Sequence, residues 1–297
     1  MKLSRLGEEG MIRRIARTIR TGPGVARGIG DDCAVLKGSG GRLKLFAADM
    51  LVEGVHFTRK TPGAQVGWKA LAVNVSDLAA MGGGIPPRQA VISLGLPRGT
   101  PVSFVDGLYL GLRRCAKMYG VDLVGGDTVR APVAVVNVAI LGEIEKNRVV
   151  YRSGARPGDD LLVTGRLGGS LKSGRHLRFQ PRLREAQALT AHAKLHAMTD
   201  LSDGLGPDLL KMCEASGVSA VLETDRIPRH VGCSVSQALN DGEDFELLIA
   251  AAPREAERLL RSIGKDLRCG LRRIGRIVTK KGKPAVTPIT PAGFRHF

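Results

Sequence analysis

The sequence is poor in cysteine, in aromatic residues and in long apolar runs. Its five cysteines are widely spaced and none stands in a Cys-x-x-Cys pair, so neither a disulfide framework nor a zinc site is expected. Aromatic residues make up 4% of the chain, which is little for a protein that stacks nucleic-acid bases. The longest apolar run, residues 133–141, is interrupted by Asn137 and is far too short to span a membrane. Because the start shows no signal-peptide pattern, we expect a cytoplasmic location.

Negative charge is also scarce relative to positive charge. The chain has 45 lysines and arginines against 28 aspartates and glutamates, which gives a formal net charge of +17. The basic residues are spread over the whole chain, so they favour a solvated surface that attracts anionic phosphate substrates. A basic RNA-binding protein is the remote alternative, since no RNA-binding signature accompanies the charge.

The length of 297 residues allows two domains, and apolar periodicity indicates helices and strands in both halves. We expect helices over residues 7–19, 68–81, 100–119 and 207–215, and strands over residues 33–36, 43–48, 91–96, 133–141, 160–164, 220–223, 245–250 and 272–278. This mixture predicts an α/β or α+β fold. The polar segment 143–148 divides the chain into a domain of residues 1–145 and a domain of residues 146–297.

Aspartates are the most informative residues, because they gather at the predicted ends of elements. They lie beside glycines or small residues in otherwise apolar surroundings: Asp31, Asp32, Asp49, Asp77, Asp127, Asp200 and Asp203. Several carboxylates can share one site only if cations offset their repulsion. Hard oxygen ligands suit Mg²⁺, with substrate phosphates completing its coordination. The pattern therefore indicates magnesium-assisted phosphoryl chemistry, while single loop aspartates as turn or capping residues remain the alternative.

Familiar nucleotide and metal motifs are missing. There is no G-x-x-x-x-G-K-[ST] loop, no G-x-G-x-x-G after a strand, and no protein-kinase motif set. His192 and His196 have helical i, i+4 spacing, but the glutamate of zinc proteases is not between them, so a metal role is not expected.

The aspartate segments nevertheless resemble one family in order and spacing, the thiamine-monophosphate kinases. The matching segments are Gly-Ile-Gly-Asp-Asp-Cys-Ala (28–34), Asp-Met-Leu-Val-Glu-Gly-Val-His-Phe (49–57), Lys-Ala-Leu-Ala-Val-Asn-Val-Ser-Asp-Leu-Ala-Ala-Met-Gly (69–82), Gly-Gly-Asp-Thr (125–128), Arg-Ser-Gly-Ala-Arg-Pro-Gly-Asp (152–159), Asp-Leu-Ser-Asp-Gly-Leu (200–205) and Gly-Glu-Asp-Phe-Glu-Leu (242–247). Leu-Gly-Glu (6–8) and Gly-Phe-Arg-His-Phe (293–297) resemble the two ends of the family's sequences, so the resemblance spans the chain.

This resemblance implies a fold, a reaction and a site. The fold is that of the aminoimidazole-ribonucleotide-synthetase (PurM-like) superfamily, with an N-terminal domain that forms a homodimer through its sheet and a C-terminal α/β domain. The reaction is ATP-dependent phosphorylation of thiamine monophosphate to thiamine diphosphate, by direct in-line transfer without a covalent nucleophile or general base. By motif, the magnesium ligands are Asp32, Asp49, Asp77, Asp127, Asp200 and Asp203; the ATP contacts are Gly126, Asp127, Arg152 and Ser202; the thiamine contacts are His56, Glu243 and Phe294.

The sequence departs from the family pattern at three places. Ala47-Ala48 stands where hydroxyl residues are common, Asn240-Asp241-Gly242 replaces a glycine pair, and segment 170–180 is short and basic. Relatives in the same superfamily, such as the purine-pathway synthetase, selenophosphate synthetase and the hydrogenase-maturation dehydratase, are the alternatives. The reactive cysteine of the last two is missing here, and the contexts of His56 and Glu243 disfavour the purine synthetase.

Overall fold

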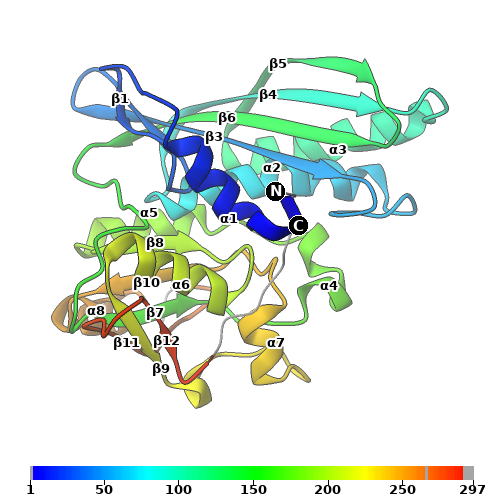
Figure 1. Ribbon diagram of the computed structural model, residues 1–297. Coiled ribbons are helices and arrows are strands. Elements are labelled where there is room, and N and C mark those ends of the chain that lie inside the picture. Colours follow the sequence, from blue (N-terminus) through cyan, green and yellow to red (C-terminus); the bar gives the residue numbers. More distant parts are fainter. Residues whose placement is uncertain (1–2, 265–266, 290–297) are drawn as a thin grey trace.

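The computed structural model describes residues 3–264 and 267–289 and contains two six-stranded sheets (Figure 1). The first sheet has the order β1-β2-β3-β6-β4-β5, and only its β4–β5 pair is parallel. Its strands are β1 (Val25–Arg27), β2 (Ala34–Lys37), β3 (Arg42–Val52), β4 (Ile85–Leu96), β5 (Val121–Arg130) and β6 (Val135–Glu145).

The second sheet has the order β12-β9-β11-β7-β10-β8, and only β12 and β9 are parallel. Its strands are β7 (Asp160–Thr164), β8 (Ala197–Asp200), β9 (Ser219–Leu222), β10 (Leu247–Ala251), β11 (Leu271–Val278) and β12 (Val286–Thr287). The predicted mixed α/β fold with two parts is therefore confirmed.

Helices α2 (Gly63–Ala80) and α3 (Val102–Tyr119) lie against one face of the first sheet (Figure 1). They approach closely because glycines stand at their crossing. A Cβ on Gly67 would lie 1.9 Å from the carbonyl oxygen of Leu108, and one on Gly111 would lie 2.0 Å from that of Ala64. Any side chain at these two positions would push the helices apart. The contact thus fixes α2, the helix that carries Asp77, beneath the sheet.

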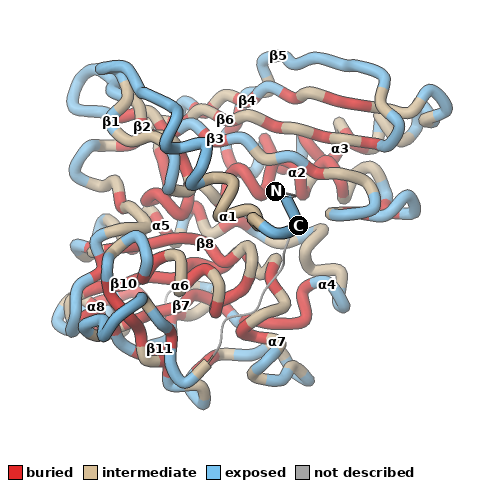
Figure 2. Tube along the Cα trace, in the orientation of Figure 1, coloured by how far each residue is buried: buried red, intermediate tan, exposed pale blue. Residues whose placement is uncertain are grey.

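The opposite face of the first sheet is open. Strand β3 alternates, with Leu45 and Leu51 buried against the helices while Phe46 and Met50 stand 45% and 54% exposed on the other side. Strand β5 is exposed along nearly all its length, as Figure 2 shows. This half of the molecule therefore has one covered and one uncovered sheet face.

The second sheet, in contrast, is covered on both faces. Residues of β10 are all buried and alternate between two apolar clusters, with Ile249 in one and Leu248 in the other. Helix α6 (Leu205–Ser216) covers the second cluster, and α5 (Leu183–His192) and α8 (Pro253–Ser262) contribute to the first. That first cluster also contains the core of the N-terminal sheet, so the two halves share a continuous apolar core.

The remaining helices are one of 14 residues at the N-terminal end and several short ones. They are α1 (Leu3–Ala16), α4 (Ser170–Ser173), α7 (Val235–Asn240), and the 3₁₀ turns η1 (Arg175–Leu177) and η2 (Thr224–Arg226). Over the described ranges, no helix combines the length and apolar character needed to cross a membrane. The division at residues 145 and 146 stays a prediction; the first sheet ends at Glu145 and the second begins at Asp160.

Two details of the sequence reading were wrong. Asp49 and Asp127 do not stand at element ends, because β3 continues through Val52 and the glycine pair before Asp127 lies inside β5. Helix α5 ends at His192, and His196 lies beyond it with its Nδ1 2.9 Å from the carboxylate of Asp159. The two histidines therefore do not share a helix face.

Candidate active site

A cleft of about 910 Å³ lies between the two halves of the molecule. Residues of α1, β3, α2 and α6 line it, together with the loops before β2 and after β8. Of the residues predicted from the sequence, nine line this cleft: Asp32, Asp49, His56, Asp77, Arg152, Asp200, Ser202, Asp203 and Glu243. Phe294 lies outside the described residues, and Gly126 and Asp127 are not among the lining residues.

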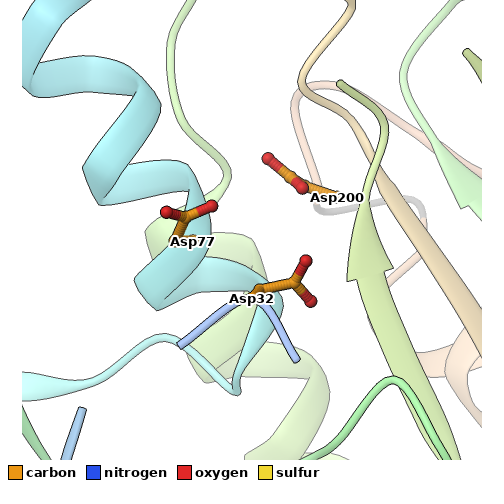
Figure 3. Close-up of side chains that lie close together, drawn as sticks. All are labelled: Asp32, Asp77 and Asp200. Atoms are coloured by element: carbon orange, nitrogen blue, oxygen red, sulfur yellow. The ribbon is translucent and has the colours of Figure 1, made fainter. Parts of the chain in front are cut away.

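Three aspartates meet at the base of the cleft, and we call them the aspartate cluster: Asp32, Asp77 and Asp200 (Figure 3). Each offers a carboxylate oxygen, and these oxygens all lie within 4.8 Å of one another. They come from three parts of the chain, since Asp32 precedes β2, Asp77 stands in the last turn of α2, and Asp200 ends β8. Asp49 points to the helix-covered face of its strand and lies against Asp77.

Burial and mutual repulsion disfavour the ionised forms of Asp77 and Asp200. Burial raises the pKa of Asp77 well above its usual value, and the charges of Asp49 and Asp200 raise it further. The pKa of Asp200 is raised in the same way, by burial and then by the charge of Asp32. A bound cation would relieve this repulsion and favour the ionised carboxylates.

The donor set fits a hard divalent cation. All three members of the aspartate cluster offer carboxylate oxygen, the ligand that Mg²⁺ prefers. The Oδ2 atom of Asp32 is buried and has no hydrogen-bond partner among the described residues. A buried carboxylate oxygen without a partner is costly, so a ligand at this position would satisfy it.

Neighbouring side chains hold the aspartate cluster in place. Ser76, one residue before Asp77 on α2, donates a hydrogen bond from Oγ to Oδ2 of Asp200 at 2.5 Å. Asp32 accepts two bonds at its other oxygen, from Nη2 of Arg152 at 2.5 Å and from Oγ1 of Thr199 at 3.1 Å. These bonds leave Asp32 Oδ2 as the atom directed at a ligand.

At a second place in the cleft, a carboxylate is already paired with a lysine, and we call this the Lys69–Glu243 pair. The fully buried Nζ of Lys69 donates to both oxygens of Glu243, at 2.7 and 2.6 Å, and to the carbonyl oxygen of His56 at 3.1 Å. The Nδ1 atom of His56 accepts from the backbone N–H of Val52 at 3.0 Å, so Nε2 carries the proton of the neutral ring. The pair thus joins the two predicted substrate residues to α2.

The loop that carries Glu243 has an unusual backbone. Glu243 and Phe245 have φ values of 54° and 51°, a region that side chains other than glycine rarely adopt. Their N–H groups donate to the carbonyl oxygens of Ser202 and Leu201, at 2.7 and 2.8 Å. The loop after β8 and the loop before β10 are therefore held together, which brings Ser202 and Glu243 to the same cleft.

Asp203 differs from the aspartate cluster because it has its own cation. Lys211 on α6 forms a short ion pair with Asp203 and a second one with the buried Asp208 at 3.1 Å. The carboxylates of Asp208 and Asp203 raise the pKa of Lys211, although its burial opposes this, so the lysine stays charged. The structure therefore offers an amino group at the position where the sequence predicted a further metal ion.

Gly126 and Asp127 do not line the cleft of the single chain. Asp127 pairs in register with Ser93 of β4 and lies exposed on the first sheet, and its Oδ1 accepts the N–H of Thr128 at 2.8 Å. Gly126 is needed for packing, because a Cβ there would lie 1.7 Å from the carbonyl oxygen of Ile92. Packing therefore requires glycine at this position, in addition to the contact with ATP that was predicted for it.

Several residues of the site escaped the sequence reading. Lys69, Ser76, Thr199 and Lys211 all bond to predicted site residues. Lys69 and Ser76 carry a visible signal, since they are among the few polar residues that interrupt an apolar helix, and both are fully buried. Thr199 and Lys211 carry no such signal, because a threonine in a strand and a lysine on a helix are ordinary surface residues.

Comparison with known proteins gives the family. Residues 30–144 match the family "AIR synthase related protein, N-terminal domain", and residues 162–287 match its C-terminal counterpart. A thiamine-monophosphate kinase of Synechococcus elongatus is 36% identical, over 94% of this chain and 90% of its own length. Another, of Rhodopirellula baltica, is 35% identical over 97% of both chains.

The fold agrees with a solved structure of this family. The structure described as AaThiL complexed with AMPPCP and TMP has a TM-score of 0.88 to this chain at 32% identity, and covers 100% of this chain and 99% of its own. The chain therefore belongs to the thiamine-monophosphate kinase family.

Proposed function

We propose that this chain transfers the γ-phosphoryl group of ATP to the phosphate of thiamine monophosphate. A phosphate oxygen of thiamine monophosphate forms the new P–O bond, the bond between the β–γ bridging oxygen and the γ-phosphorus breaks, and ADP leaves with thiamine diphosphate formed. The observation that carries the proposal is the aspartate cluster at the base of the cleft, in a chain of this family. A relative of the same fold is described with an ATP analogue and TMP bound.

We propose that the aspartate cluster, with Asp49, holds Mg²⁺ beside the nucleotide phosphates. When bound, the metal supplies positive charge that screens the two anionic substrates from each other and stabilises the transferring group. The unpartnered oxygen of Asp32 supports this assignment. Asp203, whose carboxylate is paired with Lys211, would bind a metal only if that pair opened.

The residues of the chain itself would bind and orient the substrates. Arg152 uses Nη2 on Asp32, while its Nε is buried and has no hydrogen-bond partner among the described residues, so it is available to a phosphate oxygen. Glu243 is fixed by Lys69. Its carboxylate would accept a hydrogen bond from the cationic thiamine or lie opposite its charge. No general base is required, because a phosphate nucleophile is ionised at neutral pH.

We further propose that two copies pair through the open face of the first sheet. That face carries exposed apolar side chains, among them Phe46, Met50 and Val91, and ends at the exposed edge strand β5. Such a face and edge are usually covered in a stable protein. Asp127 lies on β5 and would then stand at the interface, where its predicted metal and ATP roles stay a prediction.

The deciding experiment incubates the purified protein with ATP, Mg²⁺ and thiamine monophosphate and measures thiamine diphosphate. We expect product with thiamine monophosphate and none with unphosphorylated thiamine. Folded protein that makes no thiamine diphosphate would overturn the proposed activity.

Light scattering of wild type and Phe46→Glu/Met50→Glu tests the dimer, since two buried carboxylates would prevent pairing.

A further inference from the structure

A second pocket, of about 460 Å³, lies in the C-terminal half and is lined chiefly by arginines. We call it the arginine pocket, and its charged lining residues are Arg166, Arg175, Arg178, Arg182, Arg268, Asp244 and Glu246. Five guanidinium groups therefore meet two carboxylates, which leaves a formal excess of three positive charges. The volume is at the small end of the range for sites that hold small molecules.

Two of the five arginines are matched by the two carboxylates. Arg182 binds both oxygens of the buried Glu246, at 2.5 and 2.7 Å, and Arg175 lies 3.3 Å from Asp244. Burial raises the pKa of Asp244 to about 6, against the opposing effect of its hydrogen bonds and of the charge of Arg175. Both carboxylates of the pocket are therefore paired with an arginine.

The other three arginines have no carboxylate partner among the described residues. Arg166 donates to the carbonyl oxygen of Arg229 at 3.0 Å, and Arg178 donates to that of Ser173 at 3.2 Å. Each bond uses one of the five N–H donors of a guanidinium group. Arg268, which is exposed, forms no hydrogen bond or ion pair with any residue that the structure describes. Concave walls that gather unpaired guanidinium groups concentrate positive potential and attract anions.

The arginine pocket is separate from the candidate active site, although the same segment forms a wall of both. Along residues 243–246 the side chains alternate, with Glu243 and Phe245 lining the cleft and Asp244 and Glu246 lining the arginine pocket. The ring of Phe245 stacks on Phe179 at 4.0 Å between ring centroids and separates the two spaces. An anion in the arginine pocket would therefore not occupy the aspartate cluster.

We infer that the arginine pocket is a binding site for a small phosphate-bearing anion, distinct from the ATP and thiamine site. The planar fork of arginine matches phosphate oxygens, and Arg166 and Arg178 have donors to spare. The site also accounts for the short basic segment 170–180, which the proposed reaction does not use. Pyrophosphate is the probe that fits best, because its charge offsets the excess on the walls.

Titration calorimetry with pyrophosphate in EDTA tests the inference. EDTA removes the cation that would hold phosphate at the aspartate cluster, and the variants that follow assign the remaining binding to the arginine pocket. We expect saturable binding to wild type at constant ionic strength, weakened at least roughly tenfold in Arg166→Ala/Arg178→Ala, since each lost charge-assisted bond to phosphate lowers affinity. Arg166→Lys/Arg178→Lys keeps the charge and should retain part of the affinity, which also covers a failure of the alanine variant to fold.

A matched control is Arg113→Ala/Arg114→Ala, which removes the same charge from exposed positions on α3. This variant should bind pyrophosphate as wild type does. Equal weakening in both alanine variants would mean that only overall charge matters and would overturn the site. Wild-type affinity in Arg166→Ala/Arg178→Ala, or no saturable binding to wild type, would overturn it as well.

Discussion

The aspartate cluster and the Lys69–Glu243 pair lie in one cleft but are built on opposite electrostatic plans. In the cluster, three carboxylates meet, only that of Asp32 is paired with a guanidinium group, that of Arg152, and one buried oxygen of Asp32 has no partner among the described residues. In the pair, one carboxylate meets one buried ammonium group at hydrogen-bond distance. The difference indicates where the protein leaves room for an external cation and where it needs none.

The comparison also predicts how each place responds to mutation. Removing a charge from an unbalanced cluster relieves repulsion in the metal-free protein and harms only ligand binding. Removing a charge from a balanced buried pair leaves its partner without a counter-charge and harms the fold. Five measurements can break or sharpen this distinction.

The largest effect is expected from Asp77→Asn. The amide keeps the shape of the side chain but removes a negative charge and a proposed metal ligand from the aspartate cluster. We expect thiamine diphosphate formation to fall about a thousandfold, because the charge of the transferring group loses its counter-ion. The unfolding temperature in EDTA should rise, since burial and neighbouring charges already raise the pKa of Asp77. Wild-type turnover would contradict the role of the cluster.

Next in size is Glu243→Leu, which leaves the ammonium group of Lys69 buried without a carboxylate. We expect the free energy of unfolding at neutral pH to fall by about 3 kcal/mol. The double variant Lys69→Met/Glu243→Leu removes both charges and should recover most of this loss, as chemical denaturation would measure. A double variant as unstable as Glu243→Leu would show that the ion pair is not the cause.

The same variant has a pH dependence with a definite sign. Burial lowers the pKa of Lys69 from 10.5 in the folded protein, and loss of Glu243 removes the main opposing influence. The folded variant then binds fewer protons than the unfolded chain, so its stability should rise with pH up to about 10.5. The free energy of unfolding of wild type should rise less steeply over the same range of pH.

Adding Mg²⁺ should separate the two places in the cleft. A metal that binds only the folded chain stabilises it by about 2.7 kcal/mol at a concentration of 100 times its dissociation constant. We expect this stabilisation in wild type and in Glu243→Leu, and little of it in Asp77→Asn, measured as the change in unfolding temperature on adding EDTA. Equal stabilisation of all three proteins would mean that the metal binds elsewhere.

The smallest effect is expected from Arg152→Lys. Lysine keeps the charge beside Asp32 but loses the planar fork that could bond Asp32 and phosphate at the same time. We expect the KM for ATP to rise about tenfold with kcat little changed. Steady-state kinetics at varied ATP would measure this, and a fall in kcat alone would instead assign Arg152 to the transition state.

Local signals in the sequence sufficed for much of the fold. Residues 100–119 were predicted as a helix, and α3 indeed ends at Tyr119. Gly120 follows in the left-handed conformation at φ 61°. Strand β5 was missed because Gly125 and Gly126 resemble a loop, and only pairing with β4 makes them a strand. Such pairing depends on partners distant in sequence, which no local pattern contains.

The site divides in the same way. The members of the aspartate cluster were identified because each stands in a motif with small or glycine neighbours. The sequence could not place Asp127 on an exposed sheet face, nor pair Asp203 with Lys211, because both depend on the packing of whole elements. From the sequence, Ala47-Ala48 counted as one departure from the family pattern. In the structure the two residues differ, because the strand directs Ala47 to the buried face and Ala48 to the exposed one.

Helix α2 connects the two places compared above, since Lys69 near its start fixes Glu243 and Asp77 near its end belongs to the aspartate cluster. Eight residues of α-helix separate them by about 12 Å along the axis. The close contact with α3 at Gly67 and Gly111 holds this helix in place. With the proposed roles of Glu243 and the aspartate cluster, helix α2 sets the distance between the charged ring and the phosphate of the substrate. A substrate shortened or lengthened by a few bonds would then reach only one of the two places.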